Sequence, residues 1–143
     1  GKSMLPLLVE GEDSIELGAA EPYAAGDVLL YRRENGQFVL HRLIAVQKDG
    51  LVFCGDHQRD LEYGVPKSAV LAKMCGYYKG EAHHTVEEAD YLRYTAERVA
   101  RFPWIFRKSK AAYNLYRRIT PLHTLPSRAG HKLLRMLKIE KQK

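Results

Sequence analysis

Short runs of alternating hydrophobic and polar residues fill the first half of the chain, a pattern that is typical of β-strands. The predicted strands span residues 14–17, 27–33, 38–46, 51–55 and 69–78. Asn35-Gly36 lies between the second and third strands, and this dipeptide is the strongest short signal for a β-hairpin. Asp49-Gly50 separates the third strand from the fourth, so we expect an antiparallel meander of three strands.

A helical pattern replaces the alternation from Thr85 onward. Thr85 is followed by Glu87 and Glu88, which favours a helix start, and Pro103 ends or kinks that helix. Two further helices are predicted over residues 105–119 and 131–139. The expected fold class is mainly β with a helical C-terminal part, α+β overall. We expect a β domain over residues 1–81 and a basic helical extension over 82–143.

The size and composition limit the class of protein. A chain of 143 residues, 45% hydrophobic and 28% charged, is long enough for one compact domain with an appendage. Two cysteines, Cys54 and Cys75, do not make a disulfide scaffold, and the composition excludes collagen and low-complexity disorder. No apolar stretch reaches the roughly 18 residues of a spanning helix, and no secretory signal is visible. We therefore expect a cytoplasmic or peripheral-membrane protein. Because the sequence begins with Gly1, we also expect a preceding segment, in which an anchor is possible.

The net charge of +6 is unevenly distributed. Residues 1–81 contain nine basic and twelve acidic residues, whereas residues 82–143 contain fourteen basic and five acidic ones. Three interpretations of the basic tail stay open: a solvated face packed on the β domain, a surface that binds an anionic membrane, and a nucleic-acid surface. The absence of a helix-turn-helix pattern disfavours nucleic acid.

The candidate chemistry begins with Ser3, which is followed by Met4 and Pro6. A serine becomes a nucleophile at neutral pH only with a base, and His41 lies within the third predicted strand. A histidine in that role needs a third group that holds its tautomer and stabilises the imidazolium. If Asp49-Gly50 is a two-residue turn, Asp56 lies on the same face of the sheet as His41, whereas a bulge moves it to the other face.

Four motifs in this order, SMLP, GDVLLYRR, VLHRLIAV and FCGD, resemble the signal peptidase superfamily, which includes the LexA-like self-cleaving repressors. The resemblance covers about residues 1–80 and implies a coiled β-sheet domain with the serine just before the first strand. Most bacterial members use a lysine base, and the eukaryotic and archaeal branch uses a histidine in a His-Arg dipeptide. Because His41-Arg42 stands at that position, the chain resembles the Ser–His branch. It looks most similar to the short, anchor-less peptidase-like proteins of Gram-positive bacteria that end in a basic tail.

The resemblance implies a role for several residues. Ser3 corresponds to the nucleophile and His41 to the general base. Asp56 corresponds to the aspartate of the Gly-Asp motif, and Glu62 stands where the Ser–His branch has its triad acid, with Asp60 as a further candidate. A glutamate at that position departs from the family pattern.

The implied activity is that of a serine endopeptidase that cleaves a leader or signal-like peptide of a preprotein. The substrate is expected to bind as an added strand, with Met4 and Pro6 at the substrate site. Many members place a hydroxyl residue two positions before the serine, where this chain has Gly1, so backbone N–H groups would have to bind the oxyanion. We expect no cofactor and no metal, because the Cys and His spacing matches no metal-binding motif.

Plainer interpretations remain beside these. His41 is also explained as a core histidine bonded to a carbonyl, Asp56 as a turn residue at a strand end, and Met4 and Pro6 as residues that only shape a turn. Two other functions also fit the motifs: a catalytically idle module whose tail holds a membrane or nucleic acid, and a LexA-like regulator that cleaves itself.

Overall fold

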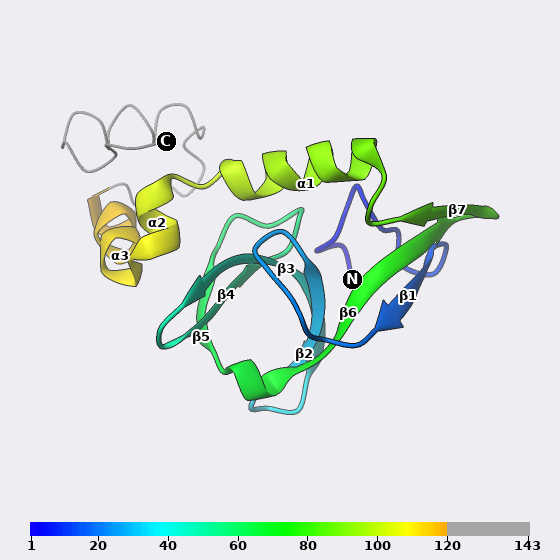
Figure 1. Ribbon diagram of the computed structural model, residues 1–143. Coiled ribbons are helices and arrows are strands. Elements are labelled where there is room, and N and C mark those ends of the chain that lie inside the picture. Colours follow the sequence, from blue (N-terminus) through cyan, green and yellow to red (C-terminus); the bar gives the residue numbers. More distant parts are fainter. Residues whose placement is uncertain (120–143) are drawn as a thin grey trace. The chain divides into compact units, whose positions relative to one another are not determined.

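The computed structural model describes residues 1–119 of the chain (Figure 1). The chain divides into two compact units between Arg98 and Val99. The boundary expected after residue 81 is therefore too early, because a further strand and most of the first helix belong to the first unit. The predicted helix at 131–139 lies outside the described residues.

The first unit is mainly an antiparallel β-sheet, as the alternating pattern predicts. Its strands follow the order β1-β6-β2-β3-β4-β5, and β7 pairs with β6. The sheet is coiled rather than flat (Figure 1). The bounds are β1 Ser14–Gly18, β2 Val28–Arg32, β3 Phe38–Gln47, β4 Gly50–Cys54, β5 Glu62–Val65, β6 Val70–Lys79 and β7 Ala82–Thr85, with a short 3-10 turn at Lys67–Ala69 between β5 and β6. Five strands match the sequence prediction, and β5 and β7 are additional strands of four residues each.

The hairpin predicted at Asn35-Gly36 joins β2 to β3. The Arg33 N–H donates to the Gln37 carbonyl (2.9 Å), and the Gly36 N–H donates to the Arg33 carbonyl (2.9 Å). Gly36 has φ +88°, a left-handed conformation that a residue with a Cβ adopts only at a cost. The pairing that follows places Leu29 opposite His41 and Tyr31 opposite Val39.

The turn between β3 and β4 differs from the prediction. Gln47 pairs with Gly50, so the two turn residues are Lys48 and Asp49 rather than Asp49 and Gly50. A bulge between Leu43 and Ala45 then shifts the register once more. The change in the turn moves the pairing by two residues, so it keeps the same residues of β4 and its following loop on the side of His41. The bulge moves the pairing by one residue and therefore reverses which of them face that side.

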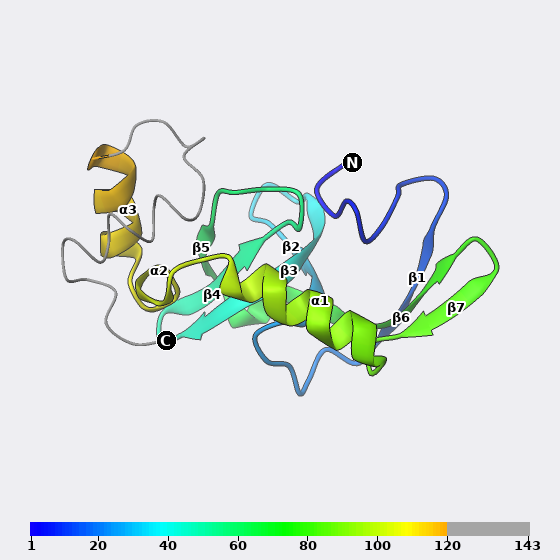
Figure 2. The same ribbon diagram turned by 90° about the horizontal axis from the view of Figure 1, so that it is seen from above.

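Two hydrophobic clusters lie on opposite faces of the sheet, because successive side chains of a strand alternate. One cluster contains Leu29, Tyr31, Val39, Leu43, Leu51, Phe53 and Val65. The other contains Met4, Leu8, Val28, Met74, Tyr77 and Tyr91. Tyr91 belongs to α1, Ala89–Ala100, which lies across the sheet (Figure 2). The helix therefore closes the second cluster.

The second unit contains α2, Trp104–Lys108, and α3, Lys110–Ile119. The single helix predicted over residues 105–119 is interrupted at Ser109, whose backbone is extended. The Ser109 hydroxyl accepts a hydrogen bond from the Ala112 N–H (3.1 Å), so this serine caps α3. None of the helices within residues 1–119 has the length and apolar character needed to cross a membrane.

Candidate functional site

Ser3 stands on a turn at the start of the described chain, and its neighbours anchor that turn. The Leu5 N–H donates to the Lys2 carbonyl (3.2 Å), and the Leu8 N–H donates to the Met4 carbonyl (3.0 Å). Met4 and Leu8 are buried in the second hydrophobic cluster, whereas Ser3 is half-buried. Burial of its neighbours therefore fixes the turn while the serine stays accessible.

The loop between β4 and β5 holds Ser3 from the other side. The His57 N–H donates to the Ser3 carbonyl (2.8 Å). A Cβ at Gly55 would lie 2.6 Å from the Ser3 carbonyl oxygen and 2.9 Å from the Ser3 Cβ, closer than van der Waals contact allows. Only glycine permits this approach, which gives a physical reason for the first residue of the Gly55-Asp56 motif.

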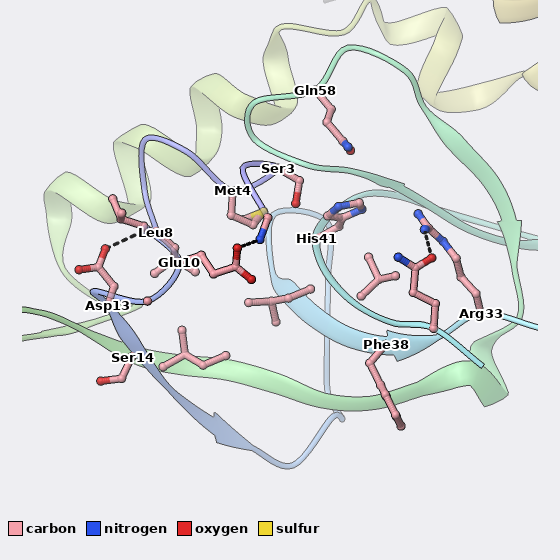
Figure 3. A pocket seen from close by; sticks show the side chains of 17 residues that line it. Ser3, Met4, Leu8, Glu10, Asp13, Ser14, Arg33, Phe38, His41 and Gln58 are labelled. Atoms are coloured by element: carbon pink, nitrogen blue, oxygen red, sulfur yellow. Dashed lines mark hydrogen bonds and ion pairs between the residues drawn. The ribbon is translucent and has the colours of Figure 1, made fainter. Parts of the chain in front are cut away.

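Ser3 and His41 line the same cavity, of about 660 Å³. Further walls come from the segment that follows Ser3, from the beginning of β1, from Phe38–His41 at the start of β3, and from Gln58. Figure 3 shows the Ser3 side chain and the His41 ring facing this hollow. The structure thus brings the predicted nucleophile and the predicted base to one site.

A chain of polar side chains holds the ring of His41, which is 5% exposed. The His41 Nδ1 lies 3.3 Å from the Tyr31 hydroxyl oxygen, and that hydroxyl donates to Glu62 Oε1 (2.7 Å). Arg33 donates to both carboxylate oxygens of Glu62, from Nε (3.1 Å) and from a terminal nitrogen (2.9 Å). Glu62 therefore reaches the histidine through Tyr31 and not directly.

The proton positions along this chain follow from its donors and acceptors. Burial alone would raise the pKa of Glu62, but the hydrogen bonds from Arg33 and Tyr31 dominate, so its pKa lies below the ordinary value and it is a carboxylate. Because Tyr31 gives its only proton to Glu62, its oxygen accepts one from His41 Nδ1. The Nε2 of His41 is then the unprotonated nitrogen, as a general base requires.

Electrostatics keep His41 neutral near pH 7. Burial is the largest cause that lowers the pKa of its imidazole below 6.5, and the charge of Arg33 lowers it further. The negative charges of Glu62 and Asp56 act in the opposite direction without reversing the shift. Burial and the neighbouring Glu62 raise the pKa of Tyr31 strongly, so its hydroxyl keeps its proton.

Asp56 lies on the face of the sheet opposite to His41, which is the position predicted for a strand with a bulge and not the one predicted for a regular two-residue turn. Asp56 accepts two hydrogen bonds from Arg42, from Nε and from a terminal nitrogen, both of 2.7 Å. Arg42 follows His41 in β3, so its side chain points to the opposite face of the sheet. The bulge after Leu43 explains the difference, because it moves the pairing by one residue. Tyr94 of α1 donates a third hydrogen bond to Asp56 (2.7 Å), and both charged side chains are fully buried.

The other predicted residues divide between the site and its surroundings. Met4 lines the cavity, whereas Pro6 is exposed and is not part of its lining. Asp60 is exposed and lines a second cavity of about 460 Å³, which His41 and Glu62 also line. His41 therefore lies between two hollows, and only the larger one contains Ser3.

Three residues of the site were missed by sequence reasoning: Tyr31, Arg33 and Gln58. The hairpin signal did not indicate Tyr31, because a two-residue turn at Asn35-Gly36 would set Tyr31 opposite Leu40, on the face away from His41. In the structure the loop is one residue longer, and Tyr31 lies opposite Val39, on the same face as His41. Gln58 lines both cavities, and no pattern in the sequence indicates it. Neither Cys54 nor Cys75 is in a disulfide, and residues 1–119 contain no cluster of side chains suited to a metal ion.

Comparison with family models, with curated proteins and with solved structures found no match to this chain.

Proposed function

We propose that this protein is a serine endopeptidase of the Ser–His type, with the coiled-sheet domain of the signal peptidase superfamily. One observation carries the proposal: Ser3 and His41 line one cavity, and the Nδ1 of His41 is held by Tyr31 so that Nε2 can accept a proton. The plainer interpretation, a core histidine bonded to a backbone carbonyl, is not supported, because the partner of Nδ1 is a side chain that leads to a carboxylate.

The chemistry follows from the roles of the two residues. The Ser3 hydroxyl oxygen attacks the peptide carbonyl carbon while its proton passes to His41 Nε2. The imidazolium then gives this proton to the leaving amine, and the C–N bond breaks to leave an ester on Ser3. Water, deprotonated by His41, hydrolyses the ester and restores the hydroxyl. Glu62 stabilises the imidazolium through the hydroxyl of Tyr31.

The cavity walls favour an extended peptide as substrate. β3 pairs with β4 only from Arg42 onward, so within the described strands the segment 38–41 has no partner on its β4 side. β1 hydrogen-bonds to β6 along one side, and no other described strand pairs with it. A peptide placed between these two strands would pair with free backbone groups, which is how strand addition binds a substrate.

The test is cleavage of an internally quenched peptide that carries an Ala-Xaa-Ala leader motif. Ser3→Ala and His41→Ala should each abolish cleavage by the full chain. Ser68→Ala and His84→Ala are matched controls, because both residues lie outside the cavity lining, and these variants should cleave normally. Cleavage that survives both site substitutions would refute the proposal.

The composition of the second unit favours a membrane surface as the location of the proposed peptidase activity. Residues 99–119 contain six basic residues and no acidic one. On α3, Leu115 is 46% exposed and Ile119 is 48% exposed, one helical turn apart. Exposed apolar residues among basic ones are typical of helices that lie on anionic bilayers. Binding to the phosphates of nucleic acid depends on the basic residues and does not require the apolar ones.

Flotation of the full chain with vesicles tests this second proposal. Binding should require phosphatidylserine and should be absent with pure phosphatidylcholine. Because each basic residue near an anionic surface contributes about 1 kcal/mol, the double variant Lys110→Gln/Arg118→Gln should bind roughly thirtyfold more weakly. The control Lys48→Gln/Lys67→Gln removes the same charge from the first unit and should bind normally. Equal binding to both kinds of vesicle, or binding only to DNA, would contradict the proposal.

A further inference from the structure

Acyl transfer by Ser3 requires hydrogen-bond donors for the oxyanion of the tetrahedral intermediate. The Ser3 N–H is one candidate, because no residue within 1–119 accepts a hydrogen bond from it. A second donor is expected, and the position two residues before the serine is Gly1, which has no side chain to supply it. The second donor must therefore come from another part of the cavity wall.

Gln58 lies where such a donor is needed. It lines the cavity together with Ser3 and His41, and Figure 3 shows its side chain extending toward the space beside these two residues. A Cβ built on Gly55 would lie 2.8 Å from Gln58 Oε1 and 2.9 Å from the Ser3 Cβ. Gln58 Oε1 and the Ser3 Cβ therefore both lie within 3 Å of this one position beside Gly55. The carboxamide of Gln58 is thus close to the proposed nucleophile.

The orientation of the Gln58 carboxamide is fixed by the loop that carries it. The Gly55 N–H donates to Gln58 Oε1 (3.3 Å), and the Gln58 N–H donates to the Gly55 carbonyl (2.9 Å). Because the oxygen of the carboxamide accepts from a backbone N–H, its NH₂ group is the end left to donate. The backbone bond between the same two residues holds the turn without help from the side chain.

We propose that the Gln58 NH₂ group donates to the oxyanion formed when Ser3 attacks a substrate carbonyl, together with the Ser3 N–H. This inference depends on the proposed peptidase function and names a residue that the family resemblance does not supply. A carboxamide donor in this role contributes mainly to the transition state, so it acts on kcat more than on KM. Gln58 is then a catalytic residue in the β4–β5 loop that also positions Ser3.

Gln58→Glu separates this role from a purely structural one. Glutamate has the same shape and keeps an oxygen that accepts the Gly55 N–H, but it has no NH₂ group to donate. Gln58→Ala removes both functions and leaves the Gln58-to-Gly55 backbone bond available. Gln47→Glu, at the end of β3 and outside the cavity lining, controls for the added negative charge.

The experiment measures steady-state hydrolysis of p-nitrophenyl acetate by the full chain, with the rate that remains in Ser3→Ala subtracted. Loss of one oxyanion donor typically lowers kcat by about a hundredfold to a thousandfold. We expect a loss of this size in both Gln58→Glu and Gln58→Ala, with KM changed less than about threefold and Gln47→Glu unaffected. The pH profile of each variant is recorded, so that a shift in the His41 titration is not mistaken for a change in kcat.

Each outcome is decisive. If Gln58→Glu retains the wild-type kcat and only Gln58→Ala loses it, the side chain supports the loop and the inference is overturned. If both variants keep the wild-type kcat, Gln58 is not a donor. If the wild-type chain hydrolyses the ester no faster than Ser3→Ala, the proposed function fails first and the inference fails with it. A wild-type chain that is active while both Gln58 variants are not is the result we expect.

Discussion

Replacing Asp56 by asparagine should destabilise the fold, whereas replacing Glu62 by glutamine should slow the reaction. Asp56 and Arg42 form a pair whose side chains are 0% exposed, with two hydrogen bonds of 2.7 Å. Burial by itself lowers the pKa of Arg42, but the bonds to Asp56 raise it further than burial lowers it, so the guanidinium is charged. Asp56→Asn leaves this charge buried without its counter-ion.

The expected cost of Asp56→Asn is about 3–5 kcal/mol, the usual effect of removing one partner of a buried ion pair. A domain of this size is stabilised by roughly 5–15 kcal/mol in total, so the variant keeps only part of its stability. At a urea dependence of about 1–3 kcal/mol per molar, the unfolding midpoint should fall by one molar or more. Urea titration followed by far-ultraviolet circular dichroism measures this change.

Glu62→Gln is the matched comparison. The Glu62 and Arg33 side chains are each 32% exposed, so water screens their pairing and the stability loss should stay below about 1 kcal/mol. The cleavage rate should nevertheless fall, because the imidazolium of His41 loses its distant counter-charge. An Asp56→Asn variant that unfolds at the wild-type midpoint and yet has lost cleavage would contradict this assignment, since Asp56 would then act on His41 rather than on the fold.

Three further results are expected. The value of kcat/KM should rise with pH and reach half its maximum below pH 6.5, because only neutral His41 is a base and its pKa is lowered; a midpoint above 6.5 would contradict this. Tyr31→Phe should lower kcat by about tenfold or more, since it removes the acceptor for His41 Nδ1–H, and an unchanged kcat would show that the tyrosine does not position the base. Gly55→Ala should cost about 1–3 kcal/mol of stability and most of the activity, because its Cβ would meet the Ser3 carbonyl at 2.6 Å; a fully active variant would mean that the loop does not hold the nucleophile.

The alternating pattern and the turn residues predicted the long strands of the sheet but not its shortest ones. The long strands β3 and β6 have ten residues each and a clear pattern, and both were predicted within one or two residues. β5 and β7 have four residues each, too few to establish a period against their surroundings. The break at Ser109 depends on a capping hydrogen bond to Ala112, which a helical periodicity over 105–119 does not show.

The site was predicted in part for similar reasons. Ser3 and His41 follow from motifs, and they do line one cavity. The position of Asp56 depended on a register without interruption after the β3–β4 turn, and the bulge after Leu43 reversed its face. The position of Tyr31 depended on a β2–β3 loop one residue longer than the predicted two-residue turn, which sets its side chain on the face of His41. Gln58 lies in a loop, where no periodicity relates sequence to position.

The dipeptide His41-Arg42 links the two faces of the sheet. Arg42 donates to the Gly26 carbonyl (2.8 Å), to the Thr95 hydroxyl (2.9 Å) and to Asp56, so one guanidinium ties β3 to a loop and to α1. α1 therefore helps to hold β3, the strand that carries His41, in place. A chain cut after residue 81 would retain every residue of the proposed chemistry, yet it would expose a cation that the helix now covers. A shortened chain, or a chimera built on this scaffold, should therefore keep α1, which runs to Ala100, together with the sheet.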